Sequence, residues 1–108
     1  MDKIVFITGA SSGIGAGCTR KFASQGASLI LNARNVNKLS ALKEELEKQY
    51  GAKIYLLPFD VRDRKAATSA LESLPKEWQS IDILVNNAGL VIGTDKEQEA
   101  VWMSGILS

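Results

Sequence analysis

Hydrophobic positions along the chain alternate between short apolar runs and longer stretches with helical spacing. The apolar runs predict four strands, at 3–8, 28–33, 53–59 and 81–89. Within these runs apolar residues follow one another directly, which is typical of parallel strands covered by helices on both faces. Pro58 has no N–H group and is therefore expected at a strand end or on a sheet edge.

The stretches between the apolar runs predict helices. The first is expected from Gly13 to about Gln25, with Gly26 as its stop. Its predicted apolar stripe consists of Ile14, Cys18 and Phe22. In the second helix the apolar positions are Val36, Leu39, Leu42, Leu46 and Tyr50, and Gly51 ends the helix.

Two more helices complete the pattern. Asp63 is the predicted N-cap of the third helix, which Pro75 closes. A last helix is expected to start near Thr94 or Asp95 and to reach the C-terminus.

Strands and helices in strict alternation predict an α/β protein with a parallel sheet and right-handed crossovers. The expected strand order is 3-2-1-4, which is the first half of a Rossmann-like, three-layer fold and slightly more. The chain has no internal repeat or linker, so residues 1–108 are interpreted as a single domain.

Composition narrows the function classes. The chain has 108 residues, 45% of them hydrophobic and 23% charged, with a net charge of +1, which is typical of a globular protein. Its charges are scattered, so no basic stripe indicates nucleic acid or an anionic membrane as a partner. Cys18 is the only cysteine, and no leader or spanning segment is recognised, so a cytoplasmic location is expected. Histidine is absent, which excludes Ser-His-Asp and Cys-His nucleophile systems.

The segment "TGASSGIG" at 8–15 follows the first strand and opens the first helix. Glycines at such a turn let a pyrophosphate approach the backbone, and the helix N-terminus offers it unpaired N–H groups. Ser11 and Ser12 add hydroxyl donors for phosphate oxygens. The segment "NNAG" at 86–89 ends the fourth strand, so both segments are expected at the crevice where the strand order reverses. A ligand-free tight turn is the alternative interpretation.

"TGASSGIG" with "NNAG" resembles the compact branch of the short-chain dehydrogenase/reductase family. The resemblance extends over residues 3 to about 92 and includes "FDVRD" at 59–63. It implies a nicotinamide dinucleotide cofactor. The cofactor-binding residues in the first loop are then Gly9, Ser11, Ser12, Gly13, Ile14 and Gly15. The resemblance further implies that Asp60 and Val61 contact the adenine, and that Asn86, Asn87, Ala88 and Gly89 line the adenosine and the nicotinamide ribose side. A turn or helix-capping acid remains the alternative for Asp60.

NADP is predicted rather than NAD. Enzymes that prefer NAD place an acid at the end of the second strand, where it binds the ribose hydroxyls and repels a 2′-phosphate. Here Asn32 stands at the predicted place of that acid, and Arg34 follows two residues later. A guanidinium suits a phosphate dianion, with Asn35 and Ser12 as assisting donors. A solvated loop cation is the alternative for Arg34.

The resemblance is narrower still to family members that oxidise small 3-hydroxy acids with NADP, so it implies hydride transfer involving a hydroxy acid or alcohol. It also implies a catalytic Tyr with a Lys four residues later, a Ser and an Asn. The tyrosines of this chain, Tyr50 and Tyr55, are followed at that distance by Ile54 and Phe59. The 108 residues are therefore expected to bind cofactor without catalysis and to be incomplete relative to the family, with no catalytic or metal-binding residue predicted.

Two other functions remain open: a nucleotide-binding module without chemistry, and an interaction protein that keeps only the fold. The fourth strand would have an unpaired apolar edge in an incomplete sheet. Self-association is therefore expected, through that strand or through the tail with Trp102 and Met103.

Overall fold

A computed structural model describes residues 1–88 and shows a four-stranded sheet with the order β3-β2-β1-β4. All three strand pairs are parallel, which confirms the predicted topology. The strands are β1 at Ile4–Thr8, β2 at Ser28–Leu31, β3 at Ile54–Leu56 and β4 at Ile83–Asn86. The predicted last helix, from Thr94 or Asp95 onward, lies outside the described residues.

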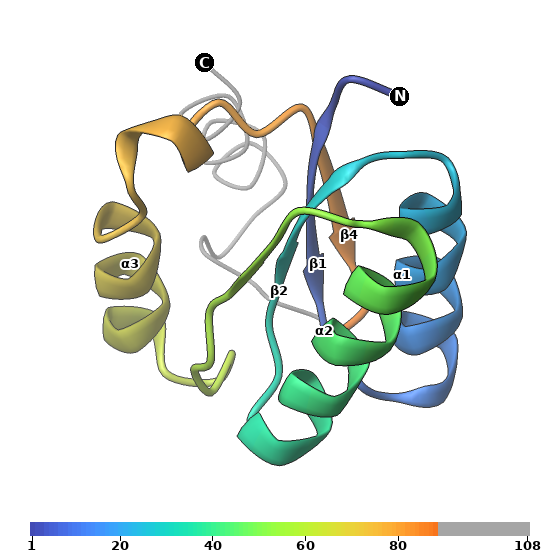
Figure 1. Cartoon of the computed structure of the whole chain (residues 1–108). Coiled ribbons are helices and arrows are strands. Elements are labelled where there is room, and N and C mark those ends of the chain that lie inside the picture. The colour runs from blue at the N-terminus through green and yellow to red at the C-terminus, as the bar shows by residue number, and fades with distance from the viewer. Residues whose placement is uncertain (89–108) are drawn as a thin grey trace.

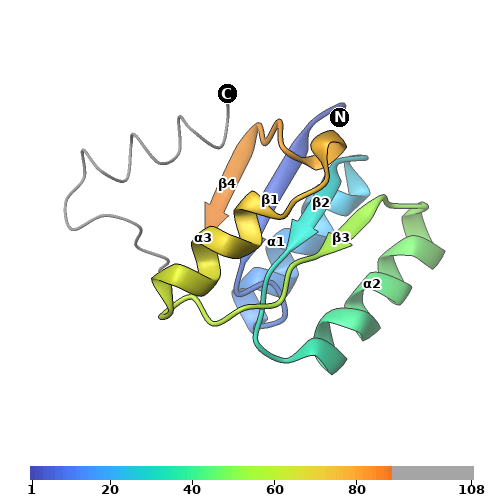
Figure 2. The same cartoon turned by 90° about the vertical axis from the view of Figure 1, so that its left-hand side faces the viewer.

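Helices cover both faces of the sheet, so the fold has three layers (Figures 1 and 2). They are α1 at Gly13–Ser24, α2 at Val36–Tyr50 and α3 at Arg64–Glu72, with a short 3-10 helix, η1, at Lys76–Trp78. Helices α1 and α2 pack on one face and α3 on the other (Figure 1).

Alternating strand residues feed two hydrophobic cores. Val5 and Ile7 of β1 point into the core under α1 and α2, while Phe6 points into the core under α3. Each central strand is therefore buried on both faces, as its continuous apolar run predicted. Two covered faces leave only the strand ends for a ligand site.

The buried face of α1 differs from the predicted stripe. Ile14 is 78% exposed, and the buried residues are instead Gly15, Ala16, Thr19 and Ala23. The helix lies so close to the strand–loop junction beneath it that small side chains face the sheet. The prediction was wrong for Ile14, whereas Phe22 of the predicted stripe is partly buried and packs against the core under α1 and α2.

The ends of α2 and α3 agree with the sequence signals. Asn35 accepts a hydrogen bond from the Lys38 amide, and Asp63 accepts one from the Ala66 amide, so both helices have side-chain N-caps. Gly51 ends α2 in the left-handed conformation, with φ of 64°. Val36 and Tyr50, at the two ends of the predicted α2 stripe, are exposed, while the three leucines between them are buried.

Strand β3 is shorter than its apolar run because pairing stops before Pro58. The Leu57 amide still donates to the Leu31 carbonyl, and the chain then leaves the sheet. In the part of the chain that the structure describes, no helix is long and apolar enough to cross a membrane.

Candidate functional site: a cationic pocket at the carboxyl ends of the strands

Thr8 connects the ends of β1 and β4 where the strand order reverses. Its side chain is buried, and its hydroxyl donates to the Asn86 side-chain oxygen at 3.1 Å. The same hydroxyl oxygen accepts a hydrogen bond from the Ala88 amide at 3.0 Å. These bonds fix the segment after β4 beside the glycine loop. Thr8 was not among the site residues predicted from the sequence. Its hydroxyl directly before Gly9 was the signal that could have indicated it.

The glycine loop and the segment after β4 approach each other too closely for side chains. Gly9 has φ of 61°, and a Cβ there would lie 2.9 Å from Asn87 Nδ2. A Cβ on Gly15 would lie 1.9 Å from the carbonyl oxygen of Gly9. Asn87 Nδ2 donates to that carbonyl oxygen and to Ser12 Oγ, both at 3.1 Å. Gly9 and Gly15 therefore allow the close contact between these segments, and Asn87 holds the glycine loop in place through its two hydrogen bonds.

The N-terminus of α1 is left open by these contacts. Ser12 is the N-cap, but its hydroxyl donates to the Gly9 carbonyl and its oxygen accepts no hydrogen bond from a helix amide, so the first turn has no side-chain cap. The leading N–H groups of a helix have no intrahelical acceptor. Among residues 1–88, a Cβ on Gly13 would meet no heavy atom within 4 Å.

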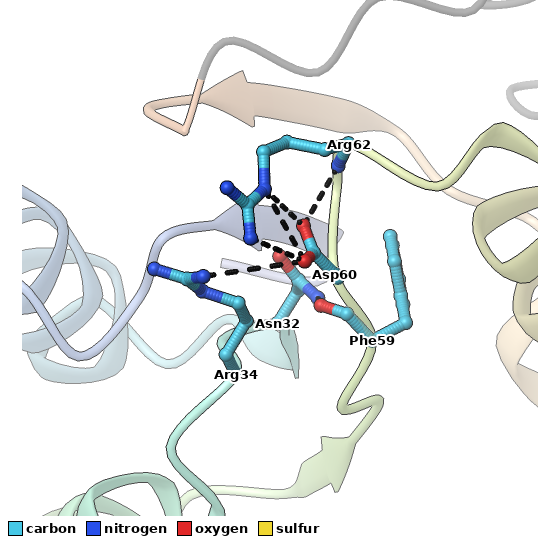
Figure 3. Close-up of polar contacts among 5 residues, drawn as sticks. All are labelled: Asn32, Arg34, Phe59, Asp60 and Arg62. Carbon is cyan, nitrogen blue, oxygen red and sulfur yellow. Dashed lines mark hydrogen bonds and ion pairs between the residues drawn. The ribbon is translucent and has the colours of Figure 1, made fainter.

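Asn32 is buried rather than directed toward a ligand. Only 1% of it is exposed, and its Nδ2 donates to the carbonyls of Leu57 at 3.1 Å and Phe59 at 3.0 Å. Figure 3 shows Asn32 beside Phe59. The side chain thus holds the end of β3 against β2. Asn32 contributes to the pocket lining, but both amide hydrogens are already donated. An acid in its place would face these main-chain oxygens.

Arg34, Asn35 and Lys38 form the rim of the pocket at the start of α2. The Arg34 side chain is 68% exposed, and its Nη1 lies 4.0 Å from Asp60 Oδ2, the limit of an ion pair. The Asn35 oxygen is engaged by the Lys38 amide at 3.1 Å, so Asn35 caps the helix. Lys38 adds a cation that sequence reasoning missed, because only the fold shows that it faces this pocket.

Asp60 is held by Arg62 at the opposite rim (Figure 3). Asp60 Oδ1 accepts from the Arg62 amide at 2.9 Å, and Asp60 Oδ2 accepts from Arg62 Nη2 at 2.8 Å. These bonds lower the pKa of the Asp60 carboxyl to about 2, with the Arg62 side chain as the largest cause and the charge of Arg34 as the smallest. The carboxylate is therefore ionised at neutral pH.

We expect this pKa to shape the acid stability of the protein. Because it lies below the usual value of about 3.9 for an unfolded chain, the contribution of Asp60 to stability is complete above that value and is lost as the pH falls toward 2. Carbon NMR of the carboxyl should show titration near pH 2, and Arg62→Ala should move the midpoint upward. A midpoint near 4 in the unsubstituted protein would contradict this assignment.

These groups surround one pocket with a volume of about 750 Å³. Of the predicted site residues, ten line it: Gly9, Ser11, Ser12, Asn32, Arg34, Asn35, Asp60, Val61, Asn87 and Ala88. The lining also includes residues that were not predicted, namely Ala33, Lys38, Phe59 and Arg62. Its ionisable side chains are three cations and one carboxylate, so the pocket favours a polyanion.

The remaining predicted residues lie beside this pocket or beyond the described chain. Gly13, Ile14 and Gly15 form the first turn of α1, and Asn86 is bonded to Thr8 at the end of β4. Gly89 lies outside the described residues. Among residues 1–88, no group of three or more metal-ligating side chains is present.

A parallel sheet with a pocket at its switch point is the arrangement in which α/β proteins commonly bind nucleotides. The family model described as short chain dehydrogenase matches residues 3–104. The chain therefore belongs to the short-chain dehydrogenase family, which confirms the resemblance found in the sequence.

Known proteins of this family match most of the chain. The NADP-dependent 3-hydroxy acid dehydrogenase of Escherichia coli strain K12 is 45% identical over 97 residues, covering 90% of this chain and 38% of that protein. Serine dehydrogenase from Escherichia coli superposes with a TM-score of 0.72 at 42% identity, over 95% of this chain and 47% of the other. L-Sorbose reductase from Gluconobacter frateurii, solved with NADPH and L-sorbose, gives a TM-score of 0.75 at 30% identity, over 98% of this chain and 44% of the other.

The chain thus spans about 38% of the length of the first of these relatives.

Proposed function

We propose that this chain binds NADP(H) in the cationic pocket, as the cofactor-binding part of a short-chain dehydrogenase. The observation that carries the proposal is that an open helix N-terminus and the side chains of Arg34, Lys38 and Arg62 border the same crevice. A dinucleotide with a 2′-phosphate carries anionic groups at two separate places, and this pocket offers a cationic or N–H-rich surface for each.

The diphosphate bridge is proposed to lie against the first turn of α1. Main-chain N–H groups and the helix dipole favour an anion there. Gly13 presents no Cβ to the approaching group, and Ser11 lines the pocket beside it. Ser12 already donates to the Gly9 carbonyl, so its proposed role is to hold the turn rather than to donate to phosphate.

The adenosine end is proposed to lie between the rims of the pocket. Arg34 and Lys38 would meet the 2′-phosphate, while Asp60 and the backbone of Val61 would meet the adenine edge. Asn87 and Ala88, with Asn86 and Gly89 beside them, would lie along the ribose of the nicotinamide half. All of these except Asn86 and Gly89 line the pocket described above.

The reaction proposed for the whole protein is hydride transfer between NADP and a small hydroxy acid or alcohol. Support comes from the NADP-dependent 3-hydroxy acid dehydrogenase and the serine dehydrogenase that the chain resembles. The bound nicotinamide supplies the hydride chemistry, and an acid/base must move the alcohol proton. The residues described here are proposed to bind and orient the cofactor. Because Tyr50 and Tyr55 are followed four residues later by Ile54 and Phe59 rather than by a lysine, we expect no turnover from these 108 residues alone.

Calorimetric titration with NADPH and NADH tests the proposal. We expect NADPH to bind and NADH to bind more weakly, because only NADPH carries a 2′-phosphate that can contact Arg34 and Lys38. Absence of NADPH binding to correctly folded protein would contradict the proposal. Turnover of a 3-hydroxy acid by these 108 residues would contradict the expectation that they bind cofactor without catalysis.

Arg34→Ala should weaken NADPH binding about tenfold, since an exposed charge-assisted contact contributes on the order of 1.4 kcal/mol. NADH binding should be unchanged because NADH has no 2′-phosphate. Arg20→Ala is the matched control: Arg20 also pairs with a carboxylate, Glu45 at 2.8 Å, but lies outside the pocket lining. An equal loss for both nucleotides in Arg34→Ala would contradict the proposed contact.

Self-association is also proposed, with the fourth strand as its site. In the described part of the chain β4 is an edge strand, and Ile83, Leu84 and Val85 are only partly buried. An apolar edge can pair with another chain. We expect light scattering at micromolar concentration to report a mass above that of a monomer, and a clean monomer would contradict this expectation. A cytoplasmic location stays a prediction.

A further inference from the structure

Two arginines approach the same carboxylate at the rim of the pocket, and they do so unequally (Figure 3). Arg62 contacts Asp60 through its amide, its Nε at 3.1 Å and its Nη2 at 2.8 Å. Arg34 reaches only to 4.0 Å from Asp60 Oδ2. Arg62 therefore holds the carboxylate through both main chain and side chain, while Arg34 has a long contact through one nitrogen.

The difference follows from position in the chain. Arg62 is two residues from Asp60, so the turn that carries both residues brings the guanidinium alongside the carboxylate. Arg34 comes from the segment after β2 and has to reach across the pocket mouth. The influence on the pKa of Asp60 has the same order, with Arg62 first and Arg34 last.

An arginine captured by a carboxylate is a poorer ligand for phosphate, because the same N–H groups serve both anions. Were Asp60 unpaired, Arg34 would need to move only about an ångström to form a close ion pair of ordinary length. Arg62 weakens this attraction, because its close bonds to both oxygens neutralise the carboxylate and leave Arg34 with only the long contact. Both guanidiniums remain largely exposed, at 68% for Arg34 and 74% for Arg62, so neither is locked by packing.

We infer that Arg62 is a positioning residue for NADP selectivity: it occupies the Asp60 carboxylate and so keeps the Arg34 guanidinium free for the 2′-phosphate. This inference rests on the proposed function of the pocket. In this arrangement one carboxylate can serve the adenine edge without competing for the arginine that the neighbouring phosphate requires.

The test compares two small nucleotides that share the adenine. The probes are 2′,5′-ADP and 5′-AMP, and the measured quantity is the ratio of their dissociation constants, in which contacts to adenine cancel. We expect Arg62→Ala to reduce the preference for 2′,5′-ADP about fivefold, which is the upper range for partly exposed ion pairs. Arg20→Ala breaks an equivalent arginine–carboxylate pair away from the pocket and should leave the ratio unchanged.

A second substitution separates positioning from direct contact. In Asp60→Asn the carboxylate that could capture Arg34 is gone, so adding Arg62→Ala should not lower the ratio further. A further loss in this double variant would show that Arg62 touches the phosphate itself and would overturn the inference. Arg62→Lys should restore part of the preference, because an ammonium also neutralises Asp60 but cannot bond both oxygens in the same way.

Other outcomes are equally decisive. If Arg62→Ala weakens binding of both nucleotides equally or leaves both affinities unchanged, the ratio of dissociation constants stays the same. Either result would overturn the inference while leaving the proposed function intact. Failure of the unsubstituted chain to bind either nucleotide would contradict the proposed function, and this inference with it. Amide NMR spectra of each variant confirm that the comparison is made between folded proteins.

Discussion

Replacing Gly15 by alanine is expected to lower the free energy of unfolding by about 3 kcal/mol, at the upper end for an overpacked site. The added Cβ would lie 1.9 Å from the Gly9 carbonyl oxygen and 2.8 Å from Asn87 Nδ2. The nearest obstacle is main chain, so it cannot rotate away as a flexible side chain would. Relief requires α1 to move away from the loop that it packs against. Chemical denaturation of the two proteins measures the difference.

The same helix supplies a control for that substitution. Gly17 also lies within α1, but a Cβ there would meet no neighbouring atom of residues 1–88 within 4 Å. Gly17→Ala should therefore raise stability by up to about 1 kcal/mol, through helix propensity alone. If Gly15→Ala were as stable as Gly17→Ala, the close approach of α1 to the Gly9 carbonyl would be wrong.

Replacing Asn32 by aspartate is expected to lower the free energy of unfolding by about 4 kcal/mol, the range for an uncompensated buried charge. The substitution removes the two N–H donors that serve the Leu57 and Phe59 carbonyls. It also places a carboxylate against those oxygens in a position where the residue is 1% exposed. Thermal or chemical unfolding at neutral pH provides the measurement.

The pH dependence of that variant gives a second check. Burial and the facing carbonyls should raise the pKa of the new carboxyl above its usual value. The folded state then binds the proton more tightly than the unfolded state, so the deficit should shrink as the pH falls through the raised pKa. Asn35→Asp is the matched control, because Asn35 is an exposed N-cap and aspartate caps helices equally well. A deficit independent of pH would contradict the buried placement of the side chain at position 32.

Much of the fold was predictable because its signals are local. Apolar runs located the strands, and Asp63 and Gly51 marked helix ends with the geometry that each favours. Alternation of strands and helices then left few topologies, and the observed order is the one expected. The glycine loop and the end of β4 met at the switch point for the same reason.

What the sequence did not reveal depends on packing between distant segments. The hydrophobic pattern pointed Ile14 inward, but close approach to the Gly9 loop placed Gly15 there instead. Asn32 stands at the expected place in the chain, yet its side chain turns to the end of β3. Lys38 and Arg62 were not predicted as site residues, because nothing in the local sequence shows that both line the same pocket.

Mapping of amide NMR shifts during an NADPH titration tests the central claim most directly. If the first turn of α1 receives the diphosphate, the largest shifts should fall on the amides of Gly13, Ile14 and Gly15, with further shifts at Arg34 and Val61. Binding that leaves those amides unchanged, or no binding at all by folded protein, would contradict this account of what the glycine loop does.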